Sequence, residues 1–249
     1  MRALGIEWYK TRRRGFWLLT LAMSAMVFLW MSIGLRDMTE AEKAQGYAYC
    51  LYQAPILSSI VMPVMIAVMV SRQCDMEHKG SAMKELFTMQ TRRSLFGAKL
   101  VCAGTYLLAA VLLQAGSFLV LGRVYGFTEA LPVGNMLLFV LSQWLVSLFL
   151  ALVIQVLAIN YVNQFIPMAA GLIAGLLGLM ALFFSPVVMR LVPSAYYGLL
   201  STTRMNWDPA SRDIEMYYVG FSAADCAVLF VLGLVIFIAA MRRFSRVEV

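Results

Sequence analysis

Charged residues are scarce in this chain. Only 13% of its 249 residues are Asp, Glu, Lys or Arg, and 62% are hydrophobic. An average soluble domain is about 25% charged and about 45–50% apolar. A water-soluble protein of this composition would expose large apolar patches to solvent. The scarcity of charge therefore excludes an ordinary soluble domain and predicts an integral membrane protein.

Motifs of catalysis and metal binding are also missing. The sequence has no GxxxxGK[ST] phosphate-binding loop, no HExxH and no GxSxG. Its one histidine is His78, and its four cysteines form no CxxC pair, which argues against a zinc or haem site. We therefore expect no enzyme and no cofactor or metal in this chain. Cys50 and Cys226 fall on the same predicted side of the membrane, where a disulfide and two unpaired thiols are both compatible with the sequence.

Apolar segments make up most of the chain. Each is long enough to cross a hydrocarbon layer of about 30 Å as a helix rising about 1.5 Å per residue. Backbone groups in lipid must be satisfied internally, which favours helices. The sequence predicts an all-α integral membrane fold with six transmembrane helices, in one transmembrane domain over residues 1–249. The six predicted spans are 15–35, 51–70, 100–121, 135–158, 165–189 and 223–241.

Basic residues divide unevenly between the two sides of these spans. Fourteen of the twenty fall on the side of both termini and of the loop between the second and third spans. This asymmetry predicts that both termini are cytoplasmic. The basic residues are scattered over short loops, which favours membrane orientation over nucleic-acid binding. No Asp, Glu, Lys or Arg lies deep in any predicted span, whereas ion-driven pumps usually carry such groups.

Four shorter features admit a structural or a functional interpretation. Residues 4–10 predict an N-terminal interfacial helix, with Leu4 and Trp8 on one face, or an irregular basic anchor. The outer segment 190–221 mixes aromatic and charged residues, which predicts short helices at the outer interface. These would form a gate or an aromatic anchor. The pair Gly171 and Gly175 predicts close helix approach, between subunits or within the chain. Ser222 is expected to cap the last span beside Asp225.

A charged insert, residues 71–99, separates the second and third spans. After Gly80, a short cytoplasmic helix would place Met83, Leu86 and Phe87 on one apolar face. Such a face suits a groove on a soluble partner. It would equally lie on the membrane, with Arg92 and Arg93 at anionic headgroups. The candidate docking residues of this coupling helix are Glu77, Gly80, Met83, Lys84, Glu85, Leu86 and Phe87.

Several stretches resemble the permease subunits of type-2 ABC exporters. In that family the insert follows a loose pattern. It begins with an acidic residue and a Gly, continues as a helical stretch, and ends with an Arg followed by a small residue and a Lys. Glu77, Gly80, Arg92 or Arg93, Ala98 and Lys99 stand at these positions. The start EWYKTRRR, residues 7–14, is similar to the E-W-x-K-x-[KR]-[KR] start of the lantibiotic-immunity and bacitracin-type permeases, and PSAY at 193–196 fits that branch. The chain departs from the pattern at Ser81, where many relatives carry Thr, and lacks a Pro before Arg92.

The resemblance implies the membrane half of an ATP-driven exporter. Two cytosolic ABC ATPase subunits and a second permease, the same or a similar chain, would be its partners, with ATP and magnesium bound in the ATPase. The cargo would be an amphipathic or antimicrobial peptide removed for self-protection. The location would be a bacterial cell membrane, in contact with lipid and with no nucleic acid. The alternative is a non-transporting polytopic scaffold or sensor anchor.

Overall fold

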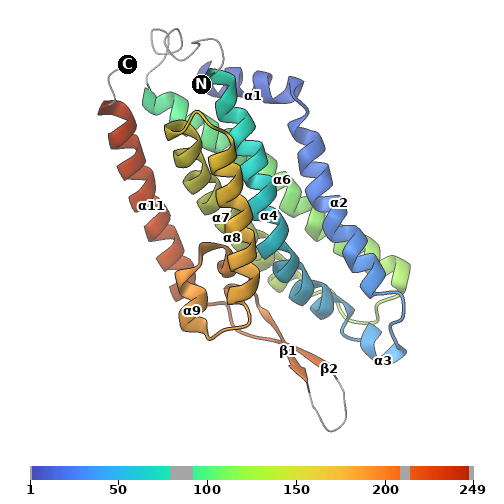
Figure 1. The fold of residues 1–249 in the computed structure, drawn as a ribbon. Coiled ribbons are helices and arrows are strands. Elements are labelled where there is room, and N and C mark those ends of the chain that lie inside the picture. The colour runs from blue at the N-terminus through green and yellow to red at the C-terminus, as the bar shows by residue number, and fades with distance from the viewer. Residues whose placement is uncertain (1, 79–91, 208–213, 247–249) are drawn as a thin grey trace.

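The computed structural model describes residues 2–78, 92–207 and 214–246, which form a bundle of long helices lying side by side (Figure 1). The long helices are α2 (Phe16–Gly34), α4 (Gly46–His78), α6 (Arg92–Tyr125), α7 (Val133–Asn160), α8 (Phe165–Ala181) and α11 (Ala223–Arg246). The shorter elements are α1 (Arg2–Arg13), α3 (Glu40–Lys43), α9 (Pro186–Leu191), the 3-10 turn η2 (Pro193–Ala195), α10 (Tyr196–Leu199) and the strands β1 (Thr203–Trp207) and β2 (Ile214–Tyr218).

Five helices of the described chain are long and apolar enough to cross a membrane: α2, α4, α6, α7 and α11. The fifth predicted span, 165–189, is shorter than expected, because α8 has 17 residues and ends at Ala181. Ser185 is extended, with φ −63° and ψ 155°, and Pro186 follows it. A residue before proline disfavours the helical conformation, so the apolar run breaks and restarts as α9.

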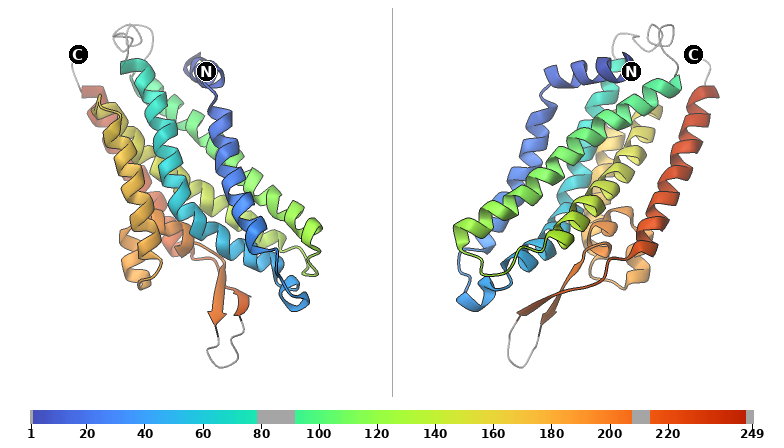
Figure 2. Two further views of the ribbon diagram at one scale, coloured as in Figure 1. Left: turned by 45° about the vertical axis from the view of Figure 1, so that its right-hand side comes forward. Right: turned by 180° about the vertical axis from the view of Figure 1, so that it is seen from behind.

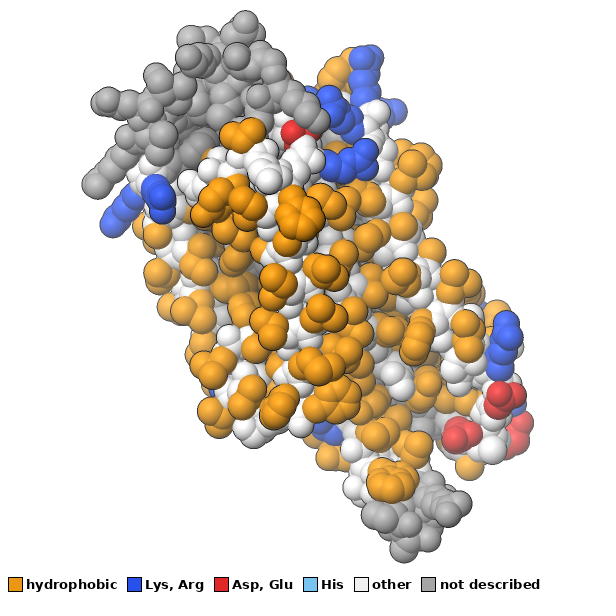
Figure 3. All heavy atoms as spheres, viewed as in Figure 1, with side chains coloured by type: hydrophobic (Ala, Val, Ile, Leu, Met, Phe, Trp, Pro, Cys, Tyr) orange, Lys and Arg blue, Asp and Glu red, His pale blue; other side chains and the backbone are white. Residues whose placement is uncertain are grey.

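The bundle has two chemically different ends. Helix α1 lies at one end, beside the ends of α4 and α6 that flank residues 79–91, and the C-terminal end of α11 lies at the same end of the bundle (Figure 2). Helix α3 and the β1–β2 hairpin lie at the opposite end. Figure 3 shows hydrophobic side chains over most of the visible face, with Lys and Arg gathered at the α1 end and several Asp and Glu at the α3 end. Both described ends of the chain thus share one end of the bundle.

Glycines on α8 let it pack directly on the backbone of α4. A Cβ atom added at Gly175 would lie 2.7 Å from the carbonyl oxygen of Ile60, and one at Gly171 would lie 2.7 Å from that of Pro63. Real side chains do not tolerate such distances, so only glycine fits. The small-residue face is therefore occupied within the chain, which decides for internal packing over a subunit interface.

The outer segment 190–221 is only partly helical. The prediction of short helices holds for residues 193–199, where Tyr196 and Tyr197 are buried. It is wrong for residues 203–218, where β1 and β2 pair antiparallel with Met205 opposite Met216. Aromatic and branched side chains that suggested an interfacial helix are also good strand formers. The tyrosines of α10 are packed inside the protein, whereas Trp207 and Tyr217 remain exposed.

The start of α11 is held by side-chain contacts. As predicted, the hydroxyl of Ser222 accepts the backbone N–H of Asp225, at 3.5 Å. The Nε of Arg190 in α9 also donates to Asp225 Oδ1 at 2.7 Å, and this hydrogen bond raises the pKa of Arg190. All four cysteines are free, so the disulfide alternative for Cys50 and Cys226 is wrong.

Candidate functional site at the ends of α4 and α6

Helix α1 turns a carboxylate toward the bundle. Glu7 and Thr11 are each 0% exposed, whereas Leu4 and Trp8 are 40% and 44% exposed. The helix predicted for residues 4–10 is thus present, and its Leu4 and Trp8 side chains are partly exposed. Such an arrangement suits a helix at a lipid surface, because the apolar side chains meet lipid and the polar ones meet protein.

Glu7 forms a buried ion pair with Lys99. The Nζ atom of Lys99 lies 3.2 Å from Glu7 Oε2, and Lys10 Nζ lies 3.2 Å from Glu7 Oε1. The Lys99 side chain is 1% exposed. A buried charge is tolerated only when paired, so this contact fixes α1 on α6.

The same lysine links the two helix ends that flank residues 79–91. Lys99 Nζ donates to the backbone oxygen of Gln73 in α4, and Gln73 Nε2 donates to the backbone oxygen of Lys99, both at 3.2 Å. A third helix joins them, because Gln155 Nε2 of α7 donates to the backbone oxygen of Phe96 at 2.9 Å. The first turns of α6 are therefore held by α1, α4 and α7 together.

Further contacts extend the seam between α1 and α6. The Thr11 hydroxyl lies 3.5 Å from Cys102 Sγ and 3.3 Å from the Tyr106 hydroxyl. Trp8 stacks on Tyr106 with ring centroids 5.2 Å apart and planes 13° from parallel. Lys99, Cys102 and Tyr106 follow one face of α6 at helical spacing. We call the set Glu7, Thr11, Gln73, Lys99 and Tyr106 the junction.

The predicted docking residues lie beyond this junction. Glu77 is in the last turn of α4, but its side chain is not among the described ones. The others lie outside the described residues: Gly80, Met83, Lys84, Glu85, Leu86 and Phe87. The coupling helix accordingly remains a prediction.

The sequence alone did not reveal the junction. Glu7 and Lys99 both appear in the family patterns quoted above, but they are far apart in the chain and nothing in the sequence links them. The available signal was the position of Lys99 directly before an apolar run, where helix α6 continues without a break. In the described residues no group of three His, Cys, Asp or Glu side chains is placed to hold a metal ion. The junction joins α1, α4 and α6 through an ion pair and hydrogen bonds.

Comparison with known families identifies the class of protein. A family model described as ABC-2 family transporter protein matches residues 3–178, well over half of the chain. The chain belongs to this family. It is a multi-pass membrane protein and a permease subunit of an ABC transporter, and membership implies association with an ATP-binding subunit. Comparison with curated proteins gives no match.

Proposed function

We propose that the chain is the permease of an exporter that moves an amphipathic or antimicrobial peptide out of a bacterial cell membrane. Two cytosolic ATPase subunits and a second permease complete the complex, and both termini face the cytoplasm. The observation that carries the proposal is the junction, because it connects the two helix ends from which a docked insert would be pulled.

Coupling through the junction requires that α4 and α6 move together. An ATPase that closes on ATP would displace the segment between His78 and Arg92. Because Lys99 binds both Gln73 and Glu7, the displacement reaches α1, α4 and α6 as one unit. Helix α4 then carries it onward, since it packs against α2, α7 and α8. Packed helices have discrete arrangements, which suits a switch between two states of a transport pathway.

Helices α4 and α8 also pack closely, which joint movement of the helices requires. The contact of Gly171 and Gly175 with the α4 backbone leaves no room for a side chain at either position of α8. A rotation of α4 would therefore carry α8 with it. This supports a mechanism in which the ATPase drives the helices as a group.

The decisive experiment is co-purification of the ATPase with variants of the insert. The predicted apolar face is Met83, Leu86 and Phe87, and Phe87 is its largest side chain. Truncating an aromatic anchor costs about 2 kcal/mol or more, roughly thirtyfold in affinity. We expect Phe87→Ala to lower the ratio of ATPase to permease in complexes purified from membranes, with Lys84→Ala as the matched control.

Two outcomes would contradict this assignment at different levels. An unchanged ratio for Phe87→Ala would place the insert on lipid and remove the docking role. Failure of any ATPase with a phosphate-binding loop to co-purify with the wild-type chain would favour a scaffold or sensor anchor. Equal expression of both variants in the membrane fraction is the control for folding.

A further inference from the structure

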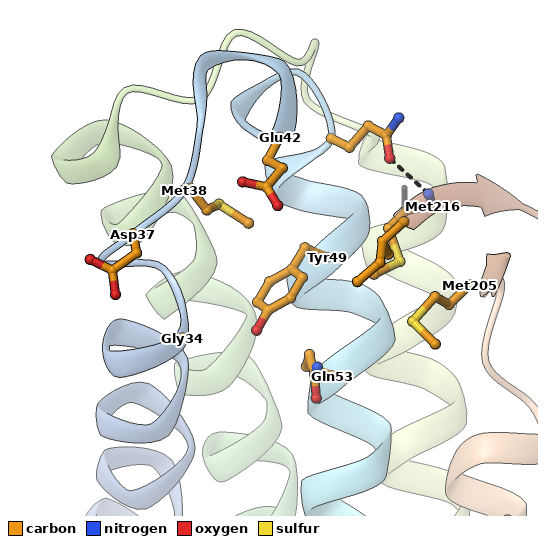
Figure 4. Close-up of a pocket in the computed structure, with 10 residues that line it drawn as sticks. Gly34, Asp37, Met38, Glu42, Tyr49, Gln53, Met205 and Met216 are labelled. Carbon is orange, nitrogen blue, oxygen red and sulfur yellow. Dashed lines mark hydrogen bonds between the residues drawn. The ribbon is translucent and has the colours of Figure 1, made fainter. Parts of the chain in front are cut away.

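A pocket opens at the α3 end of the bundle, opposite the junction (Figure 4). Its volume is about 320 Å³. Four separate parts of the chain build it: the end of α2, α3 with the loop before it, the first turns of α4, and the hairpin. The lining residues are Gly34, Asp37, Met38, Glu42, Gln45, Tyr49, Gln53, Met205, Ile214 and Met216.

Three methionines and Ile214 form the apolar part of the pocket wall. Figure 4 shows Glu42 and Tyr49 between Met38 on one side and Met205 and Met216 on the other. Methionine side chains are unbranched and polarizable, so they adapt to ligands of irregular shape and contact aromatic rings well. Met205 is 40% exposed, although it is a large apolar side chain at the rim. An apolar group entering the pocket would cover this surface.

The charge at the pocket is negative. Asp37 and Glu42 are among the lining residues, and no Lys or Arg is. Glu42 forms a capping box with Thr39, whose backbone N–H and hydroxyl both donate to Oε2, at 2.7 and 2.9 Å. Among the described residues, none donates to Glu42 Oε1. Lys43, the basic residue of α3, pairs with Glu40, with Nζ 2.7 Å from Glu40 Oε1.

Hydrogen bonds hold the hairpin wall in place. Gln45 Oε1 accepts the backbone N–H of Met216 at 2.7 Å, the dashed line in Figure 4. Glu129 accepts the backbone N–H groups of Tyr47 and Ala48 at 2.7 and 3.1 Å, and it also accepts the Tyr218 hydroxyl. Partial burial and this last hydrogen bond raise the pKa of Tyr218, which keeps its hydroxyl a donor. These hydrogen bonds attach the hairpin to the chain around the start of α4.

We propose that this pocket binds an amphipathic organic cation, an ammonium or guanidinium group on an apolar body. Glu42 and Asp37 attract the cationic group, and the three methionines with Ile214 enclose the apolar body. The ring of Tyr49 adds a face over which a cation is stabilised. The volume admits one such group of side-chain size. The site is independent of the docking insert, so the proposal holds whether or not the bound cation is the transported cargo.

Direct binding to the full chain in nanodiscs of neutral lipid tests this proposal. The probe is 3-phenylpropylammonium, and 3-phenylpropanol is its neutral counterpart of nearly the same shape. We expect calorimetry to show saturable binding of the ammonium, corrected for empty nanodiscs, and much weaker binding of the alcohol. Equal affinity for both probes, or no saturable binding of the ammonium, would overturn the proposal.

Variants locate the binding site. The double variant Asp37→Asn, Glu42→Gln removes both charges but keeps the capping box, which accepts Gln as well as Glu. We expect about fivefold weaker binding, the effect of losing partly exposed ion pairs. Glu215→Gln is the matched control, because Glu215 lies between Ile214 and Met216 in β2 and points to the other face of the strand. Unchanged binding in the double variant, or equal weakening in Glu215→Gln, would place the cation elsewhere.

Discussion

The two ends of the bundle handle charge in opposite ways. At the α1 end, Glu7 and Lys99 are almost fully buried and paired with each other. At the α3 end, Asp37 and Glu42 lie exposed around an open pocket. A buried ion pair holds helices together, whereas an exposed carboxylate next to apolar side chains can contact a ligand. The difference matches the two roles that we propose, mechanical coupling at one end and recognition at the other.

Labelling from outside the cell decides which end faces the cytoplasm, and its outcome is all or none. In a Cys226→Ser background, with the other three cysteines buried, we expect an impermeant maleimide to label Glu42→Cys. It should not label Arg243→Cys at the opposite end until the membrane is permeabilised. The excess of basic residues near both termini is the reason. The reverse pattern would exchange the roles of the two ends.

Breaking the buried pair has the largest expected effect on stability. Lys99→Met leaves the Glu7 carboxylate buried without its α6 partner, which we expect to lower the free energy of unfolding by about 3–5 kcal/mol. Replacing both residues by Met should recover about half of the loss or more, since no uncompensated charge remains. Unfolding of the purified chain in detergent measures both.

Lys10 provides the control for that experiment, because it contacts the same carboxylate. Lys10 also contacts Glu7 but is 26% exposed, so Lys10→Met should cost about 0–1 kcal/mol. A loss for Lys10→Met as large as that for Lys99→Met would mean that burial does not distinguish the two lysines. The contrast between the ends would then lose its basis.

Loosening the hairpin is an intermediate test. Tyr218→Phe removes the hydrogen bond to Glu129, which we expect to cost about 1 kcal/mol. Amide exchange in β1 and β2 should become about fivefold faster. Tyr217→Phe is the control, because its hydroxyl makes no hydrogen bond with the described residues. Equal exchange rates in both variants would mean that Glu129 does not hold the pocket wall.

The sequence predicted the spans better than it predicted their ends. Residues 135–158 were expected to cross the membrane, and α7 covers Val133–Asn160. Hydropathy marks the part of a helix that meets lipid, so it missed the polar turns with which α4 extends to His78. Pro186 indicates a helix break, but the prediction followed the continuous apolar run and extended the span through it. The hairpin was missed because interleaved aromatic and charged residues suit an interfacial helix as well as a strand.

The two candidate sites were hidden from the sequence for a common reason. Glu7 contacts Lys99, and Met38 lines the same pocket as Met216, only after the helices have packed. Residue types alone pointed to the charged insert, where charge is dense and visible. The charged residues of the two candidate sites are few, and they differ in burial: Glu7 and Lys99 are buried, whereas Asp37 and Glu42 are exposed.

The smallest expected effect is that of neutralising the exposed carboxylates on the stability of the protein. Glu42→Gln keeps the capping box with Thr39, and Asp37→Asn removes a charge that makes no ion pair within the described chain. We therefore expect each to change the free energy of unfolding by less than about 0.5 kcal/mol. A loss of 2 kcal/mol or more would show that these carboxylates hold the α3 end together as Glu7 and Lys99 hold the other. A near-zero change, together with weaker binding of the ammonium probe, would separate recognition from stability at this end.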